Sequence, residues 1–247
     1  MTIISRLFAA LAIALSFAAG AAQAQSFTPQ QKSEIEAIIR DYFIKHPELI
    51  EELQALAQTE KVKKTISENK QALFDSPRQV TLGNPNGDVT MVEFFDYNCG
   101  FCKRALDDML TLIKNNPNLR VVLKEMPVLS QGSMDAAQVA VAVAMQDKSG
   151  KRYLDFHQKL LSSRGQVDKA RALAVAKEVG ADMARIEKDM NGPEVKAALQ
   201  ESFALAEALG FQGTPSYVIG NEAIVGAVGV KELQAKINAA RCGKATC

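Results

Sequence analysis

The sequence predicts an α/β domain that carries an inserted block of helices and follows a separate helical segment. The run from Val89 to Lys124 reads strand, helix, strand, which requires a right-handed crossover and a parallel strand pair. Residues 130–210 show only helical periodicity, punctuated by glycines. Residues 25–75 are helical as well and rich in Glu, Gln and Lys. These observations predict a helical segment over residues 25–75 and a domain over residues 76–247.

The first 24 residues have the features of a cleavable export signal. Arg6 supplies a positive charge, and Leu7–Ala19 is an apolar run too short to span a bilayer comfortably. Ala22-Gln23-Ala24 has the small-x-small form of a signal peptidase site, so we expect the mature chain to begin near Gln25. Such a signal predicts a periplasmic protein. The alternative is an uncleaved membrane anchor.

The overall composition excludes several classes of partner. Lys and Arg number 29 and Asp and Glu 28, and no basic cluster stands out. A balanced chain lacks the electrostatic footprint of a nucleic-acid or anionic-lipid binder. The hydrophobic content of 47% suffices for a core, which must be mostly aliphatic because Trp is absent.

Residues 28–74 form the helical segment that precedes the domain. His46-Pro47 breaks its first helix, and Glu48–Gln58 and Glu60–Phe74 are expected to form a second and a third. The first two helices carry apolar stripes that need a partner. We expect this segment to build a homo-oligomer, a dimer or a trimer; alternatively it folds back on the domain. The stripe residues are Ile35, Ile38, Ile39, Tyr42, Phe43, Leu49, Ile50, Leu53 and Leu56.

Apolar runs and turn residues place the elements of the domain. Val89–Phe95 is apolar almost throughout, as in a strand buried on both faces. Gly220-Asn221 between two apolar runs predicts a hairpin. The expected elements are strands Val80–Leu82, Val89–Phe95, Leu119–Lys124, Ser216–Ile219 and Ala223–Val228, and helices Lys103–Lys114, Ser133–Asp147, Lys151–Leu161, Asp168–Val179, Met183–Met190, Glu194–Leu209 and Lys231–Ala240.

Cys99-Gly100-Phe101-Cys102 is the chemically most informative motif. A Cys at a helix N-terminus meets unpaired backbone N–H groups and the positive end of the macrodipole, which lowers its pKa. A second Cys one turn later can resolve a mixed disulfide formed by the first. The spacing therefore predicts a redox pair. A zinc site, completed by Cys242 and Cys247 or by His46 and His157, and a purely structural disulfide are the alternatives.

The remaining cysteines and soft ligands have mostly structural interpretations. An even number of cysteines behind an export signal favours an oxidising compartment, and short loops favour a structural Cys242–Cys247 disulfide. Free thiols or an auxiliary redox pair are the alternatives. His157 is expected to be a packing residue on a helix face. The same holds for Met134, Met145, Met183 and Met190, with a copper-binding thioether cluster as the alternative.

The buried strand, the CxxC motif, the helical insertion and Gly213-Thr214-Pro215 before a hairpin together resemble the thioredoxin-like fold. More narrowly, the chain resembles the DsbA family of periplasmic thiol–disulfide oxidoreductases. The run Glu93–Lys103 and the N-terminal segment with its His46-Pro47 break are similar to the ScsC-like branch. The resemblance extends from Phe27 to Ala240. It departs at Gly100-Phe101, where the classical oxidase has Pro-His.

The resemblance implies roles for individual residues. Cys99 is expected to be the exposed nucleophile and Cys102 the buried resolving thiol. Pro215 is expected to be a cis proline that faces the pair and presents the backbone of Thr214; from spacing alone, an ordinary trans proline fits as well. Glu93 is expected beneath Cys102, assisting its proton transfer with a raised pKa.

Some details of these roles stay open. Lys124 on the neighbouring strand is a candidate ion partner for Glu93, and an exposed strand edge is the alternative setting for Glu93. Without a His between the cysteines, we expect a Cys99 pKa that is lowered, but less than in a Pro-His oxidase.

These features predict a thiol–disulfide oxidoreductase that forms or isomerises disulfides in unfolded or misfolded exported proteins. It needs no dissociable cofactor, because the dithiol itself carries the electrons. The expected partners are these substrates and a membrane redox protein. A copper-binding or surface-associated scaffold on the same fold is the alternative.

Overall fold

The computed structural model describes residues 27–147 and 149–247, so the expected signal peptide lies outside the described residues. The chain divides into two compact units, Met1–Ala55 and Leu56–Cys247. Within the described ranges, no helix combines the length and the apolar character needed to cross a bilayer.

The N-terminal helices begin and break where the sequence signals lie. Helix α2 (Pro29–Lys45) starts with a reciprocal capping box, in which the Thr28 Oγ1 accepts from the Gln31 N–H at 3.2 Å. Helix α3 (Glu48–Glu68) follows the His46-Pro47 break and runs on into the second unit. The expected interruption between Gln58 and Glu60 is wrong, because this stretch contains neither Gly nor Pro and continues the helix.

A five-stranded sheet forms the centre of the second unit. Its strand order is β1-β3-β2-β4-β5, so β2 is the central strand. The predicted parallel pairing of β2 with β3 is confirmed, and the other neighbours are antiparallel. The last strand ends earlier than expected, because Gly226 has a positive φ of 92°. The strands are β1 (Val80–Gly83), β2 (Val89–Phe95), β3 (Leu119–Glu125), β4 (Ser216–Ile219) and β5 (Glu222–Val225).

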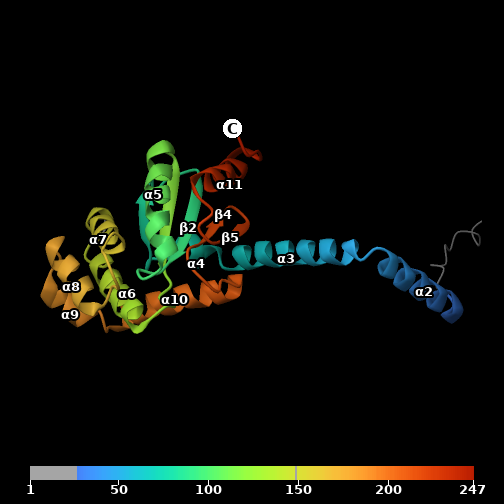
Figure 1. The fold of residues 1–247 in the computed structure, drawn as a ribbon, viewed down its shortest axis with the longest axis horizontal. Coiled ribbons are helices and arrows are strands. Elements are labelled where there is room, and N and C mark those ends of the chain that lie inside the picture. The colour runs from blue at the N-terminus through green and yellow to red at the C-terminus, as the bar shows by residue number, and fades with distance from the viewer. Residues whose placement is uncertain (1–26, 148) are drawn as a thin grey trace, which may run out of the picture. The chain divides into compact units, whose positions relative to one another are not determined.

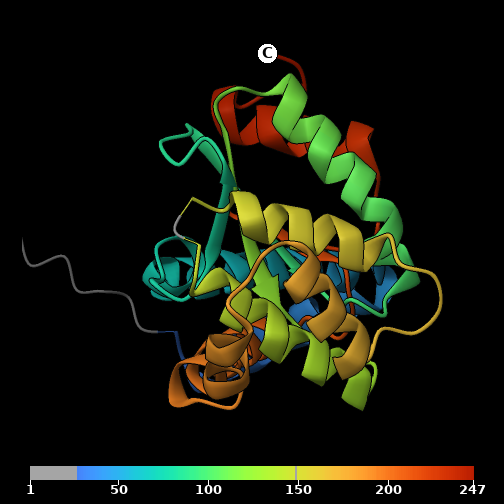
Figure 2. The same ribbon diagram turned by 90° about the vertical axis from the view of Figure 1, so that its left-hand side faces the viewer.

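Helices cover both faces of this sheet and extend beyond one side of it. On one face, Met91, Val121 and Ile219 join a large core with α5, α11 and the inserted helices. On the other face, Val92 and Phe94 pack with α4, α10 and the end of α3. Figure 1 shows α6, α7, α8 and α9 gathered at one side of the sheet, and Figure 2 views the domain from that side. The helices are α4 (Lys70–Phe74), α5 (Gly100–Asn115), α6 (Gln131–Ala144), α7 (Lys151–Leu161), α8 (Lys169–Glu178), α9 (Met183–Asp189), α10 (Pro193–Leu209) and α11 (Val230–Cys242).

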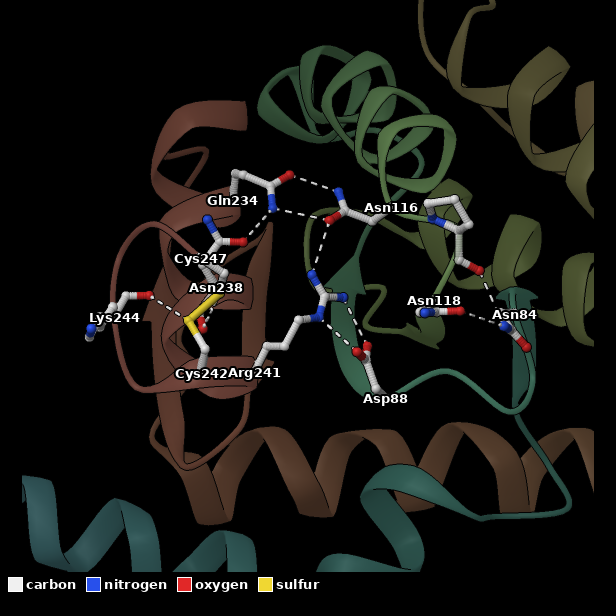
Figure 3. A network of polar contacts seen from close by, with 11 residues as sticks. Asn84, Asp88, Asn116, Asn118, Gln234, Asn238, Arg241, Cys242, Lys244 and Cys247 are labelled. Carbon is white, nitrogen blue, oxygen red and sulfur yellow. Dashed lines mark hydrogen bonds and ion pairs between the residues drawn. A yellow bond between two sulfur atoms is a disulfide. The ribbon is translucent and has the colours of Figure 1, made fainter.

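Side-chain hydrogen bonds connect α11 to the residue before β2 and to the C-terminal end of α5 (Figure 3). The Arg241 guanidinium donates two hydrogen bonds of 2.8 Å to the carboxylate of Asp88, which lies just before β2. Asn116, which caps α5, exchanges side-chain amide hydrogen bonds with Gln234 of α11 at 2.7 and 3.1 Å. A disulfide joins Cys242 to Cys247 at the end of α11. The network thus lies at the end of α5 opposite to the CxxC motif.

Candidate active site

Cys99 is the N-cap residue of α5. The helix begins at Gly100, earlier than expected from the sequence, so both cysteines belong to its first turn. The Cys99 Sγ accepts a hydrogen bond from the Cys102 backbone N–H at 3.4 Å, as an N-cap side chain does. The Cys99 N–H donates to the Asp96 carbonyl at 3.0 Å, which closes the turn between β2 and α5. The sequence therefore places the Cys99 thiol at the N-terminus of α5, which is the positive end of the helix dipole.

The two thiols have opposite electrostatic environments. The hydrogen bond from the Cys102 thiol, aided by backbone N–H groups of the first turn and opposed by burial, lowers the pKa of Cys99 to about 5. Burial raises the pKa of Cys102 far above that of an ordinary thiol. In the reduced pair at neutral pH, Cys99 is therefore a thiolate and Cys102 a thiol, both present here without a disulfide between them.

The expectation that Cys99 is exposed is wrong. Its exposed fraction is 5%, against 1% for Cys102. As a thiol, the Cys99 Sγ donates a hydrogen bond to the Thr214 carbonyl oxygen at 3.1 Å. Phe101, between the cysteines, is 58% exposed, with the Arg104 guanidinium 4.5 Å from its ring centroid.

The Thr214–Pro215 peptide bond is cis. It directly precedes β4, whose pairing with β2 brings this distant segment beside the CxxC motif. The Pro215 carbonyl accepts from the Gly226 N–H at 2.8 Å, so the hairpin holds the proline in place. Residues more than a hundred positions apart thereby meet at one site.

Glu93 lies on the central strand, with Leu123 and Tyr217 as its neighbours across the sheet. It is 4% exposed, and its Oε2 atom has no hydrogen-bond partner among the described residues. Burial, with smaller contributions from the charges of Asp108 and Cys99, raises the pKa of Glu93 to about 8. The carboxyl group is therefore mostly protonated at neutral pH. The exposed-edge alternative is wrong.

Lys124 is not the ion partner of Glu93. In the parallel register it pairs with Phe94, so its side chain points to the opposite face of the sheet. There its Nζ lies 3.0 Å from the Glu201 carboxylate and 2.7 Å from the Ala72 carbonyl of α4.

Asp96 and Asn98 belong to the site although the sequence reasoning passed over them. Asp96 is 1% exposed, and its carboxylate accepts three backbone N–H groups, from Asn98, Val128 and Leu129. The Asn98 side chain bonds both the N–H and the carbonyl of Val167 in the helical insertion. The sequence feature that could have identified them is their position, since both are polar residues between a buried strand and Cys99.

A buried cluster of aromatic and acidic side chains includes Tyr97, which belongs to the turn between β2 and α5. The Tyr97 hydroxyl is 3.3 Å from the Tyr153 hydroxyl, 3.3 Å from the His157 Nδ1 and 3.4 Å from the Glu125 carboxyl. Burial lowers the pKa of His157 to about 3, which keeps its imidazole neutral, and burial raises the pKa of Glu125 well above its ordinary value. His157 is thus a buried polar packing residue of α7, and Glu125 is a member that sequence reasoning missed.

The metal-binding alternatives gain no support from the geometry. Among residues 27–147 and 149–247, no three His, Cys, Asp or Glu side chains group in a way that would hold an ion. Of the four methionines singled out, Met190 is buried, Met134 and Met183 pack against the core, and Met145 is 39% exposed.

Comparison with known proteins places the chain in a family. Residues 90–238 match the DSBA-like thioredoxin domain, and residues 31–60 match the copper resistance protein ScsC N-terminal domain. A thioredoxin-like oxidoreductase from Silicibacter pomeroyi DSS-3 is 42% identical, with a TM-score of 0.66 over 70% of this chain and 98% of that one.

Two further structures extend the comparison. A linker-deletion mutant of Proteus mirabilis ScsC is 26% identical, with a TM-score of 0.73 over 88% of this chain and 98% of its own. The thiol-disulfide exchange protein alpha-DsbA2 from Wolbachia pipientis is 32% identical, with a TM-score of 0.67 over 74% and 97% of the two chains.

Among curated proteins, the chain is 26% identical over 167 residues to a Na(+)/H(+) antiporter NhaA from Herminiimonas arsenicoxydans. This chain spans only 26% of the length of that relative. The matched domain contains both cysteines, Glu93 and the Thr214–Pro215 bond, and the relatives support thiol–disulfide oxidoreductase chemistry in general. The chain belongs to the family of proteins with a DSBA-like thioredoxin domain, with an ScsC-like segment before it.

Proposed function

We propose that this chain is a periplasmic thiol–disulfide oxidoreductase that exchanges disulfides with exported proteins through Cys99 and Cys102. The observation that carries the proposal is the N-cap position of Cys99, whose lowered pKa of about 5 contrasts with the raised pKa of Cys102. With such a contrast, Cys99 is the sulfur that a substrate thiolate attacks and the better leaving group, and Cys102 is the resolving thiol.

In the oxidising direction, a substrate thiolate attacks the Cys99 Sγ of the Cys99–Cys102 disulfide. The bond between the two cysteines breaks, and Cys102 leaves as a thiolate that takes up a proton. A second substrate thiolate then attacks the substrate sulfur of the mixed disulfide and releases Cys99 as a thiolate. The substrate loses two electrons and the pair gains them. The low pKa of Cys99 favours its departure, because thiols of lower pKa leave faster.

Glu93 is proposed as the proton source and acceptor for Cys102. Its pKa of about 8 leaves it protonated when the Cys102 thiolate forms, so that it can donate in the oxidising direction and accept in the reverse direction. Thr214 and Pro215 are proposed to align the substrate, since the Thr214 carbonyl lies 3.1 Å from the Cys99 Sγ.

The N-terminal segment over residues 28–74 is proposed to build a homo-oligomer that brings several CxxC sites to one substrate. Within the first unit, the α2 side chains Ile38, Ile39 and Tyr42, which share one face of the helix, are 68%, 49% and 53% exposed. Such an assembly favours isomerisation of wrong disulfides, and a membrane redox partner would reset the pair after each cycle.

A direct test compares the oxidised wild-type protein with Cys99→Ser and Cys102→Ser in the oxidative refolding of a reduced, unfolded protein. We expect Cys99→Ser to abolish turnover. In Cys102→Ser, mixed with a substrate that already contains a disulfide, we expect Cys99 to attack that disulfide, release one substrate thiolate and remain trapped in a mixed disulfide. Full turnover by Cys99→Ser would contradict the proposal.

Copper binding is the second candidate, because residues 31–60 match a copper resistance protein domain and two reduced thiols are soft ligands suited to Cu(I). Titration of the reduced protein with Cu(I), alongside Cys99→Ser, separates the two functions. Tight stoichiometric binding without any disulfide turnover would favour copper carriage over catalysis.

A further inference from the structure

The Glu93 carboxyl group has one oxygen without a hydrogen-bond partner. This atom is Oε2, which bonds to none of the described residues, and Lys124 points to the opposite face of the sheet. When Cys102 takes up the proton of Glu93, a carboxylate forms on a residue that is only 4% exposed. A buried carboxylate is costly unless a donor bonds to it. A donor close to Glu93 would therefore make the proton transfer easier.

Tyr217 is the residue of β4 that lies directly opposite Glu93. The two residues are partners in the antiparallel pairing of β2 with β4, so their side chains lie on the same face of the sheet. The Cβ atoms of directly opposed residues are about 4.5–5.5 Å apart, a distance that a long side chain and an aromatic ring can bridge. Tyr217 is 1% exposed, so its hydroxyl is nearly out of contact with water.

The charges that act on the Tyr217 hydroxyl belong to the redox site. Burial raises the pKa of Tyr217, and the charge of Glu93 makes the next largest contribution. Smaller contributions come from Cys102, Asp108 and Cys99. The raised pKa keeps the proton on the hydroxyl at neutral pH, so the group is a hydrogen-bond donor for a carboxylate.

The other groups around Glu93 do not favour its ionisation. Asp108 of α5 and Cys99 raise its pKa through their negative charges. Its neighbour on β3 is apolar, and α11 contributes buried apolar side chains to the same core. Tyr153 of α7 also has its pKa raised by the charge of Glu93, but its hydroxyl donates to Glu125 at 2.8 Å.

We propose that Tyr217 is a positioning residue whose hydroxyl donates a hydrogen bond to the Glu93 carboxylate whenever Cys102 holds the proton. Rotation about the side-chain bonds of Glu93 brings the carboxylate to the hydroxyl. A hydrogen bond to the ionised form favours that form, so Glu93 accepts the Cys102 proton at a lower pH than it would without Tyr217. This inference rests on the proposed function, in which Glu93 exchanges a proton with Cys102.

The test follows the reaction of the reduced full-length protein with oxidised glutathione in two steps. The Cys99 thiolate attacks the glutathione disulfide, forms a mixed disulfide and releases one glutathione thiolate. Cys102 then gives its proton to the Glu93 carboxylate and attacks the Cys99 Sγ, which releases the second glutathione thiolate and closes the Cys99–Cys102 disulfide. The protein loses two electrons and glutathione disulfide gains them. Acid quenching and mass spectrometry measure the second step, whose rate rises with pH as Glu93 ionises.

We expect Tyr217→Phe to raise the midpoint of this pH profile by about one unit, because a hydrogen bond to a charged group is lost. Well below the midpoint, the second step should be up to about tenfold slower. Phe keeps the ring and its packing, so the first step should keep its wild-type rate. In Glu93→Gln the rise with pH should disappear, and adding Tyr217→Phe should then change nothing further, because Tyr217 acts through Glu93.

Tyr153→Phe is the matched control, because it also removes a buried hydroxyl, the one that bonds to Glu125. It should leave the midpoint at the wild-type value. An unchanged midpoint in Tyr217→Phe, loss of its first step, an equal shift in Tyr153→Phe, or a further change when Tyr217→Phe is added to Glu93→Gln would overturn the inference. A wild-type profile in Glu93→Gln alone would instead show that the proposed proton role of Glu93 is wrong, and the inference with it.

Discussion

At the scale of single residues, the site contains one ionised group, the Cys99 thiolate, and two protonated groups, Cys102 and Glu93. Cys99 is held toward its thiolate by the first turn of α5, while Cys102 and Glu93 are held in their protonated forms by burial. Neighbouring groups with pKa values pushed in opposite directions suit directional proton and electron transfer. The separation has a measurable thermodynamic consequence.

Glu93 should make the oxidised protein less stable as pH rises. Between its ordinary pKa of 4.5 and its raised pKa of about 8, the carboxyl is ionised in the unfolded chain but protonated in the folded one. The folded state then binds more protons, so the free energy of unfolding falls with pH by up to about 1.4 kcal/mol per unit. Urea unfolding of wild type and Glu93→Gln across this window measures the difference. The two stabilities should diverge as pH rises; parallel curves would contradict the assigned environment of Glu93.

The sequence was sufficient for residues whose role depends on near neighbours. Cys99 and Cys102 are three positions apart, so the helix they begin follows from local pattern. Asp96 and Glu125 act through partners far away in the chain, and the partner of Lys124 depends on the strand register, which local pattern does not give. Which face of a sheet a side chain takes changes with a one-residue shift in register.

At the scale of elements, α2 is a helix without a core of its own. Within the described residues, none of the α2 side chains is buried, although Ile35, Ile38, Ile39 and Tyr42 share one face of the helix. Elements with strong local signals were predicted well: Thr28 and His46-Pro47 bound α2. The expected break between Gln58 and Glu60 lies among polar residues that form helix readily, and α3 continues through it.

Charge on the apolar face of α2 should dissociate the proposed oligomer. We expect Ile38→Glu with Tyr42→Glu to lower the mass in solution to that of a monomer, because a buried charge without a partner is costly. Isomerisation of a scrambled disulfide protein should fall at least several-fold, whereas the rate with glutathione should not change. Light scattering and the two assays provide the readouts.

Ala37→Glu is the control, since residue 37 lies on the opposite side of α2 and is exposed. It should leave the mass unchanged. A double variant that keeps both its assembly and its isomerase activity would refute the role of this face.

At the scale of the whole domain, the two cysteine pairs lie at opposite ends of α5. The helix has 16 residues, which places its ends about 24 Å apart. Cys99 caps one end, while the Asn116–Gln234–Arg241 network and the Cys242–Cys247 disulfide lie at the other (Figure 3). The short loop between Cys242 and Cys247 predicts this pairing, but the network around it joins segments that no local pattern connects.

Removing the second disulfide should affect stability rather than catalysis. For Cys242→Ser with Cys247→Ser, we expect a loss of about 2 kcal/mol in the free energy of unfolding, as for a short closed loop. Turnover with peptide and glutathione should match the wild type. A variant of normal stability that has lost turnover would show instead that this pair takes part in the redox cycle.

The central claim is that Cys99 is a thiolate at neutral pH because of its place at the start of α5. The rate of alkylation of the reduced protein, followed across the acidic and neutral range with modification mapped to each cysteine, tests it most directly. The account predicts a single transition near pH 5 that belongs to Cys99 and is absent from Cys99→Ser. A transition near the ordinary thiol value of 9.0, or preferential labelling of Cys102, would contradict it.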